Sequence, residues 1–352
     1  MPAVIRLDFD PSTTVFGLSI RLETLALAGV IFLVLVLVAL SAGRMRSAAA
    51  GLTGPGNLPV PILRRDDLIL IAFGAVPGAV VGGRLGYALV HFDYYAGTPG
   101  AMADPGQGGL SLTLAVVLGT LTALAVARLL AAPVRLWLSV ASVPVLLGLG
   151  FGKLAMLLGG TGQGSYSDAS WATAYVRTGP WNSINPSFPA LPSQALEGVL
   201  VLAVAVLVLV LPPLLRFRVR RWRSIVRPGL APRRDWAALT GGRRYLTVVG
   251  LWAIVRFVAA FTWRDAHIVG PFGADQLVLA AVAVVALLGS PAVTALRRAR
   301  SSIGVRRAAR RASRAEKAAA AALATTAPAG VATDTSSAQP AAMDPTTTEG
   351  HA

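Results

Sequence analysis

Seven apolar runs, each about 20 residues long, constrain the fold of this chain more than any other feature of its sequence. An α-helix needs about 20 apolar residues to cross the ~30 Å hydrocarbon core of a bilayer. Only 14% of the residues are charged, compared with about 25% in soluble domains. We therefore predict an all-α integral membrane protein with about seven transmembrane helices. The predicted spans cover roughly residues 22–43, 67–92, 110–132, 136–159, 194–215, 245–263 and 274–296.

Basic residues alternate from loop to loop along these spans. The loop 216–244 contains ten arginines, whereas the loop 93–109 contains none and the loop 160–193 contains only Arg177. Cytoplasmic loops of membrane proteins carry the excess of Lys and Arg. The pattern predicts that the N-terminus lies outside and the C-terminus lies in the cytoplasm. It also accounts for the formal net charge of +16, so we expect no nucleic-acid partner.

The composition changes near the end of the chain. Residues 298–352 begin as a basic, alanine-rich stretch and end in low-complexity Ala, Thr, Pro and Ser. Such a segment lacks the apolar side chains needed to pack a core. We predict a membrane domain over residues 1–297 and a cytoplasmic tail over 298–352 that is disordered toward its end. The first 22 residues lack the pattern of a cleaved signal peptide.

Four ionisable residues lie well inside the predicted spans, away from their ends, where an unpaired charge costs about 2.5–3.5 kcal/mol on insertion scales. The predicted topology places all four toward the outer leaflet, with an excess of positive charge. Such a pocket suits a phosphate anion, because arginine offers a planar fork of donors. The alternative is structural, with an arginine paired to the carboxylate or reaching to the surface. The four residues are Arg84, Lys153, Glu197 and Arg256.

Two other features bear on the site. The glycine-rich stretch 159–164 is expected to end the fourth span and to expose backbone amides. The aromatic loop 165–193 is either a lid over a cavity or an interfacial aromatic belt. The chain has no cysteine, which excludes disulfides and cysteine-ligated metals. Its three histidines are too scattered to predict a metal site.

Several segments resemble the bacterial prolipoprotein diacylglyceryl transferases. The resemblance covers roughly residues 10–297. It is carried by "GGRLGYALVHFDYY" from Gly82, "GLGFGKLAMLLGGTGQGS" from Gly148, "LPSQALEGVL" from Leu191 and "LWAIVRFVAAFTWRDAH" from Leu251. Members of this family are seven-span proteins of the bacterial cytoplasmic membrane. They move diacylglyceryl from phosphatidylglycerol to the lipobox cysteine of a preprolipoprotein and release glycerol phosphate.

The resemblance implies which residues form the site. Its expected substrates are phosphatidylglycerol, a membrane lipid, and the signal peptide of a preprolipoprotein, with no cofactor and no metal. The thiol proton would pass to Glu197 or Glu23. The residues expected to be catalytic are Arg256, Lys153 and Glu197, and those expected to bind the headgroup are Arg84, Gly164, Gln194, Ser193 and Arg264.

The chain departs from the family pattern at several positions, including an N-terminal Tyr-Gly pair that falls at about Glu23–Thr24 and an arginine displaced by one position to Arg264. Lys153 stands for the signature arginine, Met156 for its asparagine, Thr113 for a histidine and Ala260 for a glutamate. Two functions therefore stay open. The first is diacylglyceryl transfer, and the second is a degenerate paralogue that binds a phospholipid headgroup or a membrane partner without turnover. A transporter of small anions or lipids is a third hypothesis, which a pocket confined to one leaflet does not favour.

Overall fold

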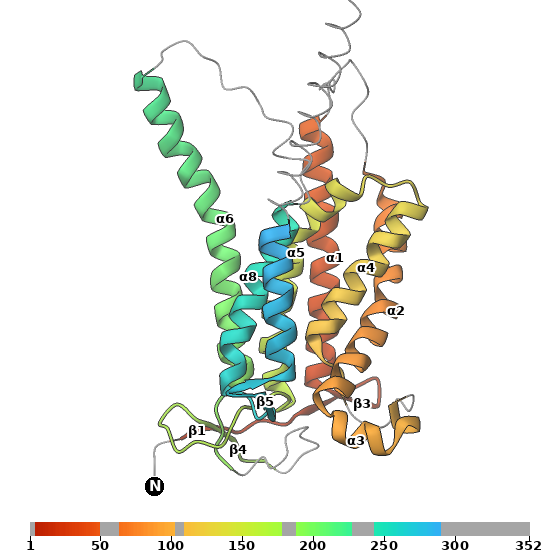
Figure 1. Ribbon diagram of the computed structural model, residues 1–352, viewed down its shortest axis with the longest axis vertical. Helices are drawn as coiled ribbons and strands as arrows, with labels where there is room; N and C mark the ends of the chain where they lie inside the picture. Colours follow the sequence, from red (N-terminus) through yellow and green to blue (C-terminus); the bar gives the residue numbers. More distant parts are fainter. Residues whose placement is uncertain (1–3, 50–62, 103–108, 178–187, 227–242, 290–352) are drawn as a thin grey trace, which may run out of the picture. The chain divides into compact units, whose positions relative to one another are not determined.

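The structure, a computed structural model, describes residues 4–49, 63–102, 109–177, 188–226 and 243–289. The chain divides into two compact units, residues 1–293 and 294–352. All the described residues belong to the first unit, and the predicted tail 298–352 lies outside them. The first unit is mostly helical, with its helices running alongside one another and its short strands gathered at one end (Figure 1).

Six helices within the described ranges are long and apolar enough to cross a membrane. Each coincides with one of the first six predicted spans. A seventh apolar helix, Ala274–Gly289, is shorter and begins where the last predicted span begins. The remainder of that span, up to residue 296, lies outside the described residues. The long helices are α1 (Leu22–Ala49), α2 (Arg65–Val90), α4 (Leu112–Leu129), α5 (Val134–Ala155), α6 (Ser193–Val226) and α8 (Arg243–Ala259).

Glycines allow α2 and α4 to approach closely. Gly74, Gly78 and Gly82 recur every four residues, so they lie on one face of α2. A Cβ atom at any of the three would overlap atoms of α4. Small residues at this spacing permit close helix contact within a membrane. The glycines that precede Arg84 therefore serve the close packing of α2 against α4.

The change Gly82→Ala is expected to destabilise the helix pair. The added methyl group would overlap the carbonyl oxygen of Leu114, and overpacking of this kind costs about 1–3 kcal/mol. The measurement is the thermal unfolding midpoint of the protein in detergent. Gly29→Ala is the matched control, because nothing lies within 4 Å of a Cβ atom at Gly29 in α1. Equal midpoints for the two variants would contradict the prediction.

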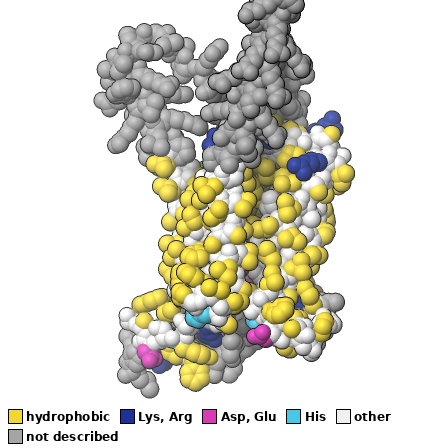
Figure 2. Space-filling view, in the orientation of Figure 1, with side chains coloured by type: hydrophobic (Ala, Val, Ile, Leu, Met, Phe, Trp, Pro, Cys, Tyr) yellow, Lys and Arg dark blue, Asp and Glu magenta, His cyan; other side chains and the backbone are white. Residues whose placement is uncertain are grey.

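The main apolar core joins α5, α6, α8 and the helix Ala274–Gly289. Its fully buried members include Leu146, Val201, Trp252 and Leu279, one from each helix. Large apolar side chains also cover the outer surfaces of the helices, among them Phe73. Figure 2 shows these hydrophobic side chains over the middle of the helices, with charged side chains toward the two ends. An apolar exterior over a tightly packed interior is what a lipid environment requires.

The fourth span ends as predicted. Helix α5 gives way to the 3-10 turn η3 (Met156–Leu158), and the glycine-rich stretch follows. Gly160 and Gly162 have φ angles of 74° and 77°, which glycine adopts at no steric cost. The chain can therefore leave the helix axis and turn back along the end of the bundle.

Short strands lie at this end of the helices (Figure 1). The parallel pair joins the N-terminal segment to the aromatic loop, with Ile5 opposite Thr173. The hairpin β5–β6 links η4 (Ala260–Thr262), the turn that follows α8, to the helix Ala274–Gly289. The strands are β1 (Ile5–Leu7), β2 (Ser12–Val15), β3 (Leu18–Arg21), β4 (Thr173–Tyr175), β5 (His267–Val269) and β6 (Phe272–Gly273).

Candidate functional site

A cluster of buried charges connects three helices and the start of a fourth. Arg256 of α8 donates from Nη1 to Glu197 of α6, at 2.8 Å and 3.0 Å from the two carboxylate oxygens. The Nζ atom of Lys153, on α5, lies 3.1 Å from the same carboxylate. Each of the three residues is buried, and Glu197 is fully so. The prediction that the charges of the fourth, fifth and sixth spans come together is therefore confirmed.

The cluster includes a second carboxylate that the sequence analysis missed. The Nη2 atom of Arg256 donates to Oδ2 of Asp275 at 3.0 Å. The two cations are thereby matched by two carboxylates, so the predicted excess of positive charge among these groups is wrong. The available signal was the position of Asp275, the second residue of the last apolar run. A carboxylate there can meet a cation on a neighbouring span.

Thr113 and Trp263 complete the surroundings of the two cations. The Nε atom of Arg256 donates to the fully buried hydroxyl of Thr113, 3.1 Å away. The guanidinium thus has a partner in each of three directions. The ring of Trp263 covers both cations, with its centroid 4.2 Å from Nζ of Lys153 and 5.5 Å from Cζ of Arg256. Such contacts favour a cation over the face of the indole.

The predicted residues Gly164, Ser193 and Arg264 form a second group of contacts. Arg264 donates from Nε to the carbonyl of Gly164, and its guanidinium lies 4.3 Å from the ring centroid of Tyr166. Ser193 donates to the carbonyl of Thr262 at 3.1 Å. A Cβ atom at position 164 would overlap both the Ser193 hydroxyl and the Thr262 carbonyl. The glycine therefore lets the loop after α5 pack against the start of α6 and the end of α8.

Two polar groups beside this contact have unused hydrogen-bonding capacity within the described ranges. The Nη2 atom of Arg264 is buried and has no hydrogen-bond partner there. The side chain of Gln194 is fully buried beside the hydroxyl of Tyr175, and most of the hydrogen-bonding capacity of its amide is unused there. Buried polar groups are normally paired, and an exception calls for an explanation such as a ligand.

Arg84 contacts backbone carbonyl groups of the segment that follows α2. Its Nε donates to Met102 at 2.9 Å, and its Nη2 donates to Ala101 at 3.0 Å. Its Nη1 lies 3.4 Å from the carbonyl oxygen of Gly109. Arg84 thus contacts Ala101 and Met102, which follow α3 (Phe92–Gly97), and Gly109, which precedes α4. We expected Arg84 to lie beside the other charges inside the spans. Those charges, on Lys153, Glu197 and Arg256, instead contact one another.

Glu23 lies at the start of α1 and contacts the glycine-rich stretch. It is buried and accepts a hydrogen bond from Thr161 at 2.8 Å. Tyr175 of β4 donates to the carbonyl of Leu157 at 2.7 Å, and burial raises the pKa of its hydroxyl to about 12. The first part of the aromatic loop is therefore held against the end of α5.

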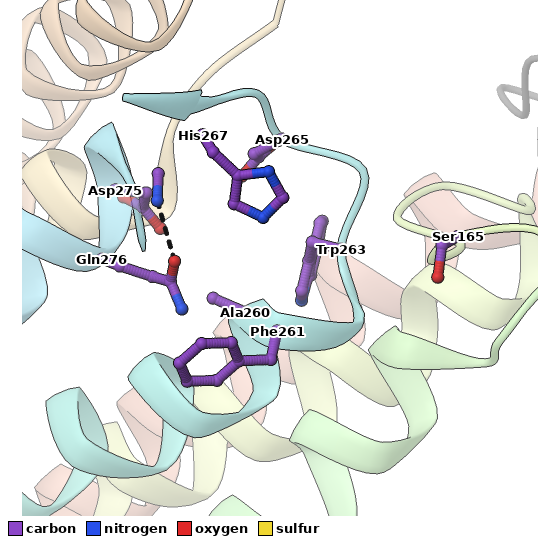
Figure 3. Close-up of a pocket in the computed structure, with 9 residues that line it drawn as sticks. Ser165, Ala260, Phe261, Trp263, Asp265, His267, Asp275 and Gln276 are labelled. Atoms are coloured by element: carbon purple, nitrogen blue, oxygen red, sulfur yellow. Dashed lines mark hydrogen bonds between the residues drawn. The ribbon is translucent and has the colours of Figure 1, made fainter. Parts of the chain in front are cut away.

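A pocket of about 220 Å³ lies beside the charge cluster (Figure 3). Two of the residues that line it also contact the cluster: Asp275 is paired with Arg256, and Trp263 covers both cations. Gln276 accepts a hydrogen bond from the backbone of Gly273 at 2.9 Å, which holds the hairpin against the last helix. The pocket is lined by Ser165, Ala260, Phe261, Trp263, Asp265, His267, Gly273, Asp275 and Gln276.

The chain is similar to known proteins of one family. The model of the prolipoprotein diacylglyceryl transferase family matches residues 18–290. A phosphatidylglycerol–prolipoprotein diacylglyceryl transferase of Rhizobium meliloti is 31% identical over 256 residues, covering 72% of this chain and 80% of the relative. The Sinorhizobium medicae protein of the same name is 32% identical over the same length and shares of each chain. The chain belongs to the prolipoprotein diacylglyceryl transferase family.

Proposed function

We propose that this protein transfers diacylglyceryl from phosphatidylglycerol to the cysteine thiol of a preprolipoprotein. The observation that carries the proposal is the buried Arg256–Glu197–Lys153 cluster, which lies next to a pocket at one end of the helices. Buried ionisable groups in membrane spans are costly and usually mark a functional site. The relatives that match most of the chain carry the name of this activity.

The substrates and the topology form part of the same proposal. The protein is a seven-span protein of the bacterial cytoplasmic membrane, with its N-terminus outside and its C-terminus inside. Residues 1–297 form the membrane domain and residues 298–352 form a cytoplasmic tail. The arginine-rich loop 216–244 supports this orientation, because cytoplasmic loops carry the excess of basic residues. The charge cluster then faces the outer leaflet, where the signal peptide of an exported lipoprotein arrives.

The cations of the site stabilise the leaving group. When the carbon–oxygen bond to the phosphate breaks, negative charge grows on the departing glycerol phosphate. Lys153 and Arg256 lie where their remaining N–H groups can meet that charge, and stabilising a developing charge lowers the barrier. Glu197 holds both cations in place. Ser193, Gln194, Gly164 and Arg264 shape the neighbouring wall, and Arg84 binds the headgroup side of the lipid.

The purified protein tests the proposal directly. Incubated in phosphatidylglycerol micelles with a peptide that contains a lipobox cysteine, it is expected to add one diacylglyceryl group to the peptide and release glycerol phosphate. Mass spectrometry of the peptide measures the first product. Well-folded protein that binds phosphatidylglycerol but gives no product would instead favour a binding role without turnover.

The change Lys153→Met is expected to lower kcat/KM about 10²- to 10³-fold, because one cation near the leaving phosphate is lost. Lys153→Arg restores the residue of the family signature and is expected to stay within about tenfold of the wild type, since it keeps the charge and adds a planar fork. The peptide assay measures both variants. An equal loss in both would show that the shape of the lysine, rather than its charge, matters.

A further inference from the structure

The wall of the pocket carries a carboxylate that the reaction described so far does not use. Asp265 lies between η4 and β5, on the segment that connects α8 to the hairpin. It lines the pocket together with Asp275, Trp263 and His267 (Figure 3). Asp275 is ion-paired with Arg256, and Trp263 covers both cations. A thiol in this pocket would therefore lie next to the cations proposed to hold the phosphate.

The two carboxylates of the cluster are already paired with its cations. Glu197 accepts hydrogen bonds from Arg256 and lies in an ion pair with Lys153. Asp275 accepts from Arg256 and also from the hydroxyl of Ser111, at 3.3 Å. Both carboxylates therefore hold the cations of the cluster in place.

Asp265 is in a different environment. Among the described residues it makes neither a hydrogen bond nor an ion pair, and it is exposed at the wall of the pocket. The walls of the pocket remove part of the hydration of its carboxyl group, which raises the pKa of that group, and the nearby Asp275 raises the pKa further. Arg256, His91 and Lys153 act in the opposite direction. A carboxylate whose pKa is raised toward neutrality is a better general base than an ordinary one.

We propose that Asp265 accepts the thiol proton of the substrate cysteine. This step rests on the proposed transferase function. The proton passes from sulfur to the Asp265 carboxylate as the sulfur bonds to the diacylglyceryl carbon that bears the phosphate ester. The bond between that carbon and the phosphate oxygen breaks, and glycerol phosphate leaves with the bonding electrons. The Asp265 carboxyl group then returns its proton to the departing phosphate or to water.

The test compares Asp265→Asn with the wild type in the peptide assay. The amide keeps the size of the side chain but cannot act as a base, so we expect kcat/KM to fall about 10²- to 10⁴-fold, the range for general base catalysis. Asp93→Asn is the matched control, because Asp93 is an exposed carboxylate in α3. It is expected to retain wild-type activity. Thermal unfolding midpoints establish that each variant is folded.

The pH profile separates a catalytic role from a structural one. Below the pKa of Asp265 its carboxyl group is protonated and cannot accept a proton, so wild-type kcat/KM is expected to fall as the pH falls. Because this pKa is raised, the fall is expected at higher pH than the ordinary aspartate value of about 3.9. In Asp265→Asn that limb disappears, and the remaining rate rises with ionisation of the peptide thiol, near pH 8.5.

A small external carboxylate provides a second readout. Formate is expected to restore part of the activity of Asp265→Gly and to leave the wild type unchanged. If wild-type protein turns over and Asp265→Asn stays within threefold of it, the assignment of Asp265 is overturned and the transferase function stands. If His267→Gln, rather than Asp265→Asn, removes the acid limb, the base is His267 and the proposal also fails. A folded wild type without turnover overturns the transferase function and this step with it.

Discussion

Replacing Glu197 with alanine is expected to cost about 3–5 kcal/mol of folding free energy, the range for removing one partner of a buried ion pair. Glu197 is fully buried and contacts both Arg256 and Lys153. Without its carboxylate, two buried cations share Asp275 alone, and their mutual repulsion is no longer offset. The unfolding free energy in mixed detergent micelles measures the effect, together with the yield of protein from the membrane.

Two further variants define how this stability arises. Glu197→Gln keeps the shape and one acceptor oxygen, so its loss is expected to be smaller than that of Glu197→Ala. Asp8→Asn removes an ion pair with Arg177 in which both side chains are more than half exposed, at 57% and 64%. Exposed pairs contribute about 0–1 kcal/mol, so this variant should unfold like the wild type. A Glu197→Ala protein within 1 kcal/mol of the wild type would show that the cluster is hydrated.

The helices of this protein were predictable from the sequence because the bilayer imposes a length on each span. All six candidate spans begin and end within a few residues of the predicted runs. The contact among Lys153, Glu197 and Arg256 was also predictable, because three costly charges at one depth stabilise one another if they meet. The depth of a residue in the membrane follows from its position along its span, and that position can be read directly from the sequence.

The direction in which each side chain points was harder to predict. Arg84 lies in the same half of its span as the others by sequence, yet its hydrogen bonds go to the carbonyls of Ala101 and Met102. The partners of Arg84 depend on which face of α2 packs against α4. Helix packing sets that face. Asp275 was missed for a related reason. Asp275 is the second residue of its span. The sequence therefore indicates a residue at the membrane boundary, although Asp275 contacts Arg256.

The arginine at the centre of the cluster should be the least replaceable residue of the proposed reaction. Arg256 donates in three directions, from Nε to Thr113, from Nη1 to Glu197 and from Nη2 to Asp275. A lysine keeps the charge but has one nitrogen on a flexible stem, so it cannot span these partners. Removing one preorganised donor commonly costs about 10²- to 10³-fold in rate. Arg256→Lys is therefore expected to lose at least about 10³-fold in kcat/KM, since several donors shift together.

Comparing the unfolding free energy of Arg256→Lys with its kcat/KM shows whether the lost activity reflects lost stability or a weaker reaction step. Arg256→Lys retains a cation beside Glu197 and Asp275, so its unfolding free energy should fall less than that of Glu197→Ala while its activity falls further than that of Lys153→Arg. Arg177→Lys is the control, because the Arg177 side chain is 57% exposed in its ion pair with Asp8, and we expect wild-type turnover from it. If Arg256→Lys stays within tenfold of the wild type, the fork of Arg256 is not needed for the reaction, and a positive charge at this position is sufficient to stabilise the leaving phosphate.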